Sequence, residues 1–172
     1  VEEHLDNLKA KEGDQKMACG CPSTQIQSFM TKACDDANQP AAMAGTESAL
    51  AHWPIQINLV PPHAPFLKNA DLLVVADCAP LAFPDFHSRF LKGRAVMMGC
   101  PKFDNAEAYI EKFAQVFSTA GIKSITTVTM EVPCCSGLPF IIQKGLEKSG
   151  KDIPLTKVVI STRGEILEEK AA

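Results

Sequence analysis

No hydrophobic run in the 172-residue sequence approaches the roughly 20 apolar residues that a membrane-spanning helix needs, because Asp77, Pro84 and Asp85 interrupt the longest ones. The net charge is -3 and no lysine or arginine cluster occurs, so nothing in the charge favours nucleic acid as a partner. The first residues show no secretory signal pattern. We therefore expect a cytoplasmic protein with reduced thiols and with neither a membrane nor nucleic acid as partner.

Motifs for nucleotide binding and for serine hydrolase chemistry are absent. The sequence contains no Gly-x-Gly-x-x-Gly, no Walker loop and no Gly-x-Ser-x-Gly, so neither activity has support. Seven cysteines make an odd count, and an apolar content of 46% allows a core without disulfides. Metal ligation or catalysis therefore explains the cysteines better than cross-linking does.

The sequence from residue 51 to residue 172 predicts an α/β domain. Short apolar runs predict strands, and they alternate with amphipathic stretches that predict helices. The expected strands cover residues 55–60, 72–76, 95–98, 122–132 and 158–160, the first of them half-buried or at an edge and the last of them closing the series. The alternation predicts a mostly parallel sheet with helices on both faces.

Two helices of this domain carry recognisable start and stop signals. The first contains the apolar stripe of residues 106–117, with Asp104 and Glu107 as an expected capping box and Gly121 as a left-handed end. The second is expected to begin at Ser136 and to stop at Gly150.

Residues 1–50 form a less regular segment ahead of the α/β domain. Residues 1–11 predict a short polar helix, and Ser23 or Thr24 is a candidate cap for another that carries Ile26, Phe29 and Met30. Residues 34–47 are small and polar with no sustained period, which indicates a mobile surface excursion. We expect the segment and the domain to form one compact unit overall.

Four cysteines follow hydrophobic runs at proline-marked turns. Cys78 stands in Asp-Cys-Ala-Pro, Cys100 in Gly-Cys-Pro, and Cys134 and Cys135 in Val-Pro-Cys-Cys-Ser-Gly. Because the carboxyl ends of parallel strands lie at one edge of a sheet, we expect these thiols to converge there. Cys19 and Cys21 lie in an Ala-Cys-Gly-Cys-Pro loop that could fold over the same edge. The pattern predicts a metal site, while Cys34, among flexible polar neighbours, is expected to take no part.

The spacing of these thiols favours an iron-sulfur cluster, since thiolates are soft ligands and the paired Cys-x2-4-Cys knuckles of structural zinc sites are absent. Adjacent cysteines tend to point apart, which suits different metals of a polynuclear centre. Cys134 and Cys135 also precede a predicted helix start, where free N–H groups favour an anion. A zinc site and simple core filling remain the alternatives.

Other polar residues near the expected edge have weaker claims. Asp77 directly precedes Cys78, and His63 and His87 lie in flanking loops. Each is a candidate to orient a metal ligand through a hydrogen bond, to carry a proton or to act as an additional ligand. Surface histidines without a function are commoner. Lys102 could offset the charge of a cluster.

Several of these segments resemble the C-terminal region of ferredoxin-type iron-sulfur proteins of anaerobic bacteria and archaea. The likeness covers about residues 17–167 and includes Ala-Cys-Gly-Cys-Pro, His-Trp-Pro-Ile-Gln, Leu-Val-Pro-Pro-His-Ala-Pro-Phe, Ala-Asp-Cys-Ala-Pro, Gly-Cys-Pro-Lys-Phe-Asp, Met-Glu-Val-Pro-Cys-Cys-Ser-Gly and Gly-Lys-Asp-Ile-Pro-Leu. In that family a two-cluster ferredoxin module usually precedes this region, and its Cys-x2-Cys-x2-Cys-x3-Cys runs do not occur here. The resemblance therefore implies an excised C-terminal domain.

The same resemblance implies a set of cluster ligands and a redox partner. Carried over by position, the ligands are Cys19, Cys21, Cys78, Cys100, Cys134 and Cys135. Electrons would come from a ferredoxin module or from a separate electron-transfer protein, and a homo-oligomer is an open possibility.

The leading hypothesis is a redox protein with a 4Fe-4S or larger cluster, acting in electron transfer or as a reductase. Six thiols exceed the four that an ordinary cubane needs, so the extra pair could enlarge the cluster, hold a second metal or exchange as a disulfide. A metal carrier or cluster-assembly protein is one alternative. A structural zinc interaction module is the other.

Overall fold

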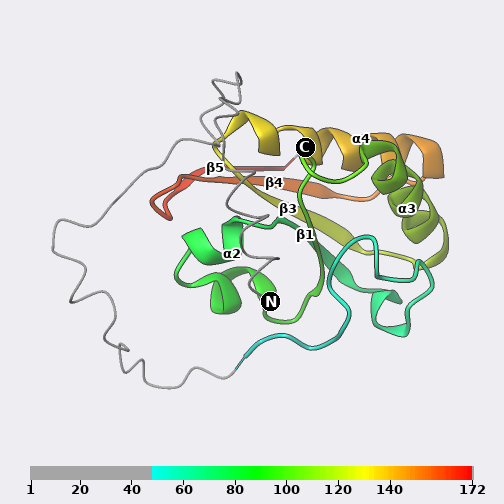
Figure 1. Cartoon of the computed structure of the whole chain (residues 1–172). Coiled ribbons are helices and arrows are strands. Elements are labelled where there is room, and N and C mark those ends of the chain that lie inside the picture. Colours follow the sequence, from blue (N-terminus) through cyan, green and yellow to red (C-terminus); the bar gives the residue numbers. More distant parts are fainter. Residues whose placement is uncertain (1–47, 172) are drawn as a thin grey trace, which may run out of the picture.

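Five strands form one sheet in the computed structural model, which describes residues 48–171 (Figure 1). The strands are β1 Asp71–Ala76, β2 Ala95–Gly99, β3 Ser124–Met130, β4 Leu155–Ile160 and β5 Ile166–Ala171. The predictions made for Cys19, Cys21, Cys34 and the two early helices lie outside the described residues. Among residues 48–171, none of the helices combines the length and the hydropathy that a membrane span requires.

The sheet has the order β2-β1-β3-β4-β5, with β1 to β4 parallel and β5 antiparallel to β4. From β1 the chain moves one way to β2, and from β2 it passes back over β1 to reach β3. Right-handed crossovers in opposite directions place their helices on opposite faces. Helix α2, Ala79–Ala82, accordingly covers one face, while α3, Ala106–Thr119, and α4, Gly137–Ser149, cover the other (Figure 1). The predicted α/β class is confirmed.

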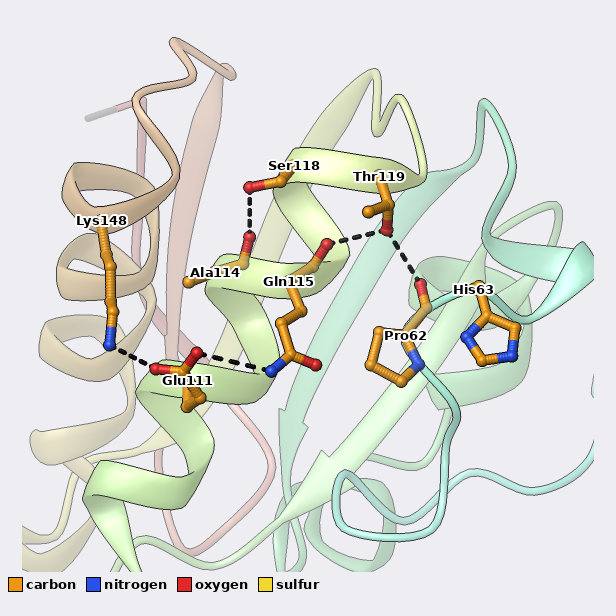
Figure 2. A pocket seen from close by; sticks show the side chains of 8 residues that line it. All are labelled: Pro62, His63, Glu111, Ala114, Gln115, Ser118, Thr119 and Lys148. Carbon is orange, nitrogen blue, oxygen red and sulfur yellow. Dashed lines mark hydrogen bonds and ion pairs between the residues drawn. The ribbon is translucent and has the colours of Figure 1, made fainter.

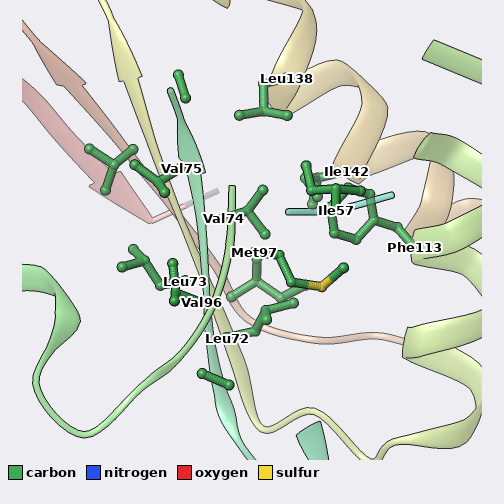
Figure 3. Close-up of a cluster of buried hydrophobic side chains, with 14 of the residues drawn as sticks. Ile57, Leu72, Leu73, Val74, Val75, Val96, Met97, Phe113, Leu138 and Ile142 are labelled. Carbon is green, nitrogen blue, oxygen red and sulfur yellow. The ribbon is translucent and has the colours of Figure 1, made fainter. Parts of the chain in front are cut away.

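The core surrounds β1, which is paired on both sides. Five of its six residues are buried, in keeping with the continuous apolar run Leu72 to Ala76. Figure 3 shows this strand's side chains together with Val96 and Met97 of β2, and with Phe113, Leu138 and Ile142 from the helices on one face.

The start of α3 differs from the prediction in its capping residue. The Asn105 side chain accepts a hydrogen bond of 3.1 Å from the Ala108 N–H, so Asn105 is the N-cap and the predicted Asp104 and Glu107 capping box is wrong. The Asp104 side chain instead accepts hydrogen bonds from the Cys100 N–H and from the Tyr109 hydroxyl. Gly121, with φ of 66°, has the predicted left-handed conformation just beyond the helix.

Helix α4 begins and ends where the sequence predicts, but Ser136 does not cap it with its side chain. The Ser136 hydroxyl donates to the Pro133 carbonyl at 2.7 Å, within the short turn η4, Pro133–Cys135. Gly150 ends the helix with φ of 65°, as expected for a glycine in this position.

Residues 55–60, predicted as a strand, form a single bridge and then a turn. Met98 N–H donates to the Ile55 carbonyl at 2.8 Å and Ile57 N–H donates to the Met98 carbonyl at 2.9 Å, so the segment does lie along the outer edge of β2. The chain then turns, because the N–H groups of Leu59 and Val60 both bond to the Gln56 carbonyl. That turn prevents further pairing.

A histidine side chain extends this cover along β2. His52 Nε2 accepts a hydrogen bond of 2.8 Å from the Val96 N–H, and its ring stacks on Phe66 with centroids 3.8 Å apart. Burial lowers the pKa of His52, which favours the unprotonated nitrogen that this bond requires.

The opposite edge of the sheet is β5, which follows the strand predicted to be the last. Its residues are exposed apart from the half-buried Ile166, and it carries Glu168, Glu169 and Lys170. Charged side chains on an edge strand discourage pairing with another chain. Arg89, from the one-turn η3 segment His87–Leu91, forms an ion pair of 2.8 Å with Glu169.

We predict that protonation of His52 weakens the fold. Because its pKa in the folded state lies below the ordinary value of about 6.5, its contribution is complete above that pH and is lost as the pH falls through the lowered pKa. Urea unfolding at several pH values should show a loss of stability below about pH 6.5 that is smaller in His52→Gln, which keeps an acceptor but does not titrate. Identical pH profiles for the two proteins would contradict this role of His52.

Candidate functional site

Three loops that carry thiols meet where the winding of the sheet reverses. Cys78 lies two residues after β1, Cys100 directly follows β2, and Cys134 and Cys135 lie in the turn after β3. Because β1 stands between β2 and β3, the chain leaves the carboxyl ends of β1 and β3 toward opposite faces. Ligands of open α/β sheets bind in the crevice outside the strand ends at such a switch point. The topology therefore predicts a ligand-binding site at this edge of the sheet.

Two of the loops pack directly against each other. A Cβ atom built on Gly137, the first residue of α4, would lie 3.5 Å from Pro101 Cβ, so the residue after Cys100 contacts the start of the helix that follows Cys135. This contact joins the β2 and β3 loops next to their cysteines.

Two of the four thiols, those of Cys78 and Cys135, feel their neighbours electrostatically. Partial burial raises the pKa of Cys78, and Cys100, Asp77 and Cys134 raise it further. Burial raises the pKa of Cys135 to about 12, and Cys134 and Cys78 add to that shift. All four are free thiols, with Cys78 exposed and Cys135 buried. The structure thus brings Cys78, Cys100, Cys134 and Cys135 into one neighbourhood, with protonated forms favoured at Cys78 and Cys135.

A pair of carboxyl groups stands beside these thiols. Asp104 accepts hydrogen bonds from the Tyr109 hydroxyl at 2.5 Å and from the Cys100 N–H at 3.3 Å. Asp77 has one buried carboxyl oxygen, Oδ1, with no hydrogen-bond partner. Burial raises the pKa of Asp77, and the charge of Asp104 raises it further. Tyr109 is fully buried, and burial followed by its bond to Asp104 raises its pKa far above the ordinary value.

The role of Tyr109 was not foreseeable from its place in the apolar stripe of α3. It is the single tyrosine of the chain, and its spacing fits a core position, which it does occupy. Asp104 and Tyr109 are five residues apart in the sequence. This short separation is the signal that could have indicated that the Tyr109 hydroxyl reaches the loop after β2. Gly99 is the second residue missed, because a Cβ there would clash with the Tyr109 hydroxyl and lie 2.8 Å from Ile57 Cδ1.

The other polar candidates divide between two places. His87 lies near the thiol edge, where it lines a cavity together with Asp77 and accepts a hydrogen bond of 3.1 Å from the Ala49 N–H through Nδ1. Lys102 Nζ lies 5.8 Å from the centre of the Phe103 ring. His63 lines a separate groove along α3, shown in Figure 2.

The groove in Figure 2 is not the candidate site. It has a volume of about 510 Å³, and its lining includes Glu111, Gln115 and Lys148. These side chains are already paired, since Lys148 forms an ion pair with Glu111 and Gln115 donates to Glu111 at 3.4 Å. It also contains no cysteine.

A ready-made metal site is not present in the part of the chain that the structure covers. Among residues 48–171 no group of three or more histidine, cysteine, aspartate or glutamate side chains has the arrangement that holds a metal ion. Cys19 and Cys21, the remaining predicted ligands, lie outside those residues. The thiols therefore share a neighbourhood without forming a coordination polyhedron.

The comparisons agree with this architecture. A family model described as a Rossmann-like domain matches residues 64–172. The chain belongs to this family. An uncharacterised protein of Archaeoglobus fulgidus is 35% identical over 114 residues, which cover 66% of this chain and 80% of that protein. No solved structure shows significant similarity.

Although the chain belongs to this family, the loop after β1 is not a phosphate-binding loop. The turn after β1 reads Asp-Cys-Ala-Pro and leads into a helix of only four residues. A dinucleotide fold needs glycines and the start of a long helix at this position. Asp77 would also repel a phosphate. The chemistry of this edge is that of thiols and carboxyls.

We predict that Gly99→Ala destabilises the protein by about 1–3 kcal/mol through overpacking. Since the nearest obstructing atom is the Tyr109 hydroxyl oxygen, the penalty should be smaller in a Tyr109→Phe background, by about 0.5 kcal/mol or more. Urea unfolding of the two single variants and the double variant measures this coupling. Equal penalties in both backgrounds would show that Tyr109 does not confine Gly99.

Proposed function

We propose that the chain binds an iron-sulfur cluster at the carboxyl edge of its sheet and acts in electron transfer or as a reductase. The observation that carries the proposal is the gathering of Cys78, Cys100, Cys134 and Cys135 from three loops at the switch point, where each lies within electrostatic range of another. Thiolates are the ligands that iron-sulfur clusters use. Core filling does not explain this gathering, because Cys78 is exposed and Cys100 and Cys134 are half-buried.

The donor set fits such a cluster better than it fits a single zinc ion. The side chains of Cys134 and Cys135 lie within hydrogen-bond range of each other, so the expectation that these adjacent thiols point apart is wrong, and the two would have to separate to face different metals. The α4 amino terminus begins two residues after Cys135, and its free N–H groups favour a nearby anion. Pro80, Pro101 and Pro133 fix the backbone φ angle at one position in each of the three loops, which limits the conformations that the cysteine-bearing loops can adopt.

Binding would require the side chains to rearrange and lose protons. Within residues 48–171 the thiols do not yet form a metal-holding group, and burial favours the protonated form of Cys78 and Cys135. Metal binding deprotonates cysteine ligands and couples to local folding. Cys19 and Cys21 remain proposed as additional ligands.

A metal carrier or cluster-assembly protein is the second candidate. The specific observation in its favour is the exposure of Cys78, since a donor must be reached by an acceptor protein. Such a protein would release its metal to a competing thiol acceptor, whereas a redox protein would retain it. The redox protein would work with a ferredoxin module or a separate electron-transfer protein as its partner.

We predict that anaerobically purified protein is brown and contains iron with acid-labile sulfide. Cys100→Ser and Cys134→Ser should each lose most of the iron, because each removes a soft ligand. Cys34→Ser is the matched control and should keep it. Iron and sulfide analysis with absorption spectroscopy measures these outcomes. Colourless protein with one zinc and no sulfide would refute the cluster, and equal loss in all three variants would refute the choice of ligands.

A double variant tests the Cys-Gly-Cys loop. We predict that Cys19→Ser with Cys21→Ser keeps the circular dichroism spectrum of the folded sheet but changes the absorption or EPR signal of the cluster. The reason is that the loop precedes the α/β domain that the sequence predicts from residue 51 onward. Unaltered iron content and spectra would reduce the site to the four cysteines at the strand ends.

A further inference from the structure

A cavity of about 360 Å³ opens beside the thiol edge, on the face of the sheet that α2 covers. Its wall is mainly apolar, with side chains from Ile55, Val75, Phe86, Leu91, Val96 and Met98. Val75 of β1 and Asp77, the residue that follows the strand, both line the cavity. The volume is at the lower end of the range for small-molecule pockets.

One acidic group breaks this apolar surface. Asp77 lines the cavity, and its Oδ1 atom is buried without a hydrogen-bond partner. A buried carboxyl oxygen without a partner is costly, and most such groups in native proteins are satisfied by protein, water or ligand. A hydrogen-bond donor supplied by a ligand would satisfy it.

The charges around the cavity favour a positively charged donor. Asp104 lies close enough to act electrostatically on Asp77. No lysine or arginine of residues 48–171 lines the cavity. His87 accepts the Ala49 N–H through Nδ1, which requires that this nitrogen be unprotonated. A carboxylate ligand would therefore meet repulsion here, and a protonated amine would meet attraction.

We propose that this cavity binds a small, mainly apolar molecule that carries one protonated amino group. The Asp77 carboxylate accepts a hydrogen bond from that amino group. The apolar body of the ligand lies against the side chains from β1, β2 and the residues after α2. Cys78 follows Asp77 in the chain, so the amino group is held next to the thiol edge. No metal is required for this binding, which makes it testable whether or not the thiols hold a cluster.

Three matched probes test the proposal: n-hexylamine, 1-hexanol and hexanoate, titrated at pH 7 and constant ionic strength into the metal-free, 15N-labelled full chain. We expect saturable shifts of the amide signals of residues 75–98 with hexylamine, at a dissociation constant at least about tenfold below that of hexanol. Hexanoate should bind weakest. Equal affinity for hexylamine and hexanol would show an apolar cavity without amine recognition and overturn the proposal, as would stronger binding of hexanoate or no saturable binding of hexylamine.

Asp77→Asn tests the contact itself, because it removes the charge with little change of shape. The preference for hexylamine over hexanol should fall to about one. Asp71→Asn is the matched control, since Asp71 lies at the other end of β1, is exposed and accepts a hydrogen bond of 2.6 Å from Ser124. An unchanged preference in Asp77→Asn, or an equal loss in Asp71→Asn, would overturn the proposal. If Asp77→Asn does not fold, the comparison of probes on the unaltered chain still decides it.

Discussion

The pairing of β1 on both sides is the constraint on which the rest of this structure depends. The two neighbours, β2 and β3, bury β1, whose side chains are apolar on both faces of the sheet. The chain therefore runs from β1 to β2 on one side and then crosses back over β1 to reach β3 on the other side. The reversal separates the helices onto two faces and opens a crevice at the carboxyl ends of β1 and β3. Asp77 and Cys78, the first residues after the strand, are thereby placed at this crevice.

The chemistry of that point differs from what the fold most often carries there. Phosphate-binding members of such folds present glycines and helix N–H groups, whereas this edge presents thiols, two carboxyl groups and the buried Tyr109 hydroxyl. Burial works against the charged forms of Asp77, Cys78 and Cys135, so the site without a ligand favours neutral groups. Cations are the ligands that would reverse this preference, either a soft metal at the sulfur atoms or an amine at the carboxyl group.

The sequence predicts the α/β class and the four strands β1 to β4, because alternating apolar runs and helical stripes are local patterns. The further strand expected at residues 55–60 forms only a bridge. The sequence also predicts where the thiols of Cys78, Cys100, Cys134 and Cys135 gather, since they mark strand ends. It does not predict β5, whose charged residues show no apolar alternation. Nor does the sequence show that Asn105, and not Asp104, is the N-cap of α3. The Asp104 carboxylate accepts the hydrogen bond of the Tyr109 hydroxyl, a contact that depends on the folded structure, while Asn105 accepts the Ala108 N–H. Whether the thiols ligate a metal depends on side-chain geometry that no local pattern encodes.

The cover along β2 has a consequence for how other proteins can approach. Val96 N–H is bonded to His52, and both backbone groups of Met98 are bonded to residues 55 and 57, so the outer side of β2 has few groups left for an added strand. The other border, β5, is lined with charged residues. A strand of another chain could therefore form few backbone hydrogen bonds with β2, and at β5 it would meet charged side chains. Recognition of the described part of the chain by another protein, or by a second copy of itself, therefore depends on its loops and helix surfaces.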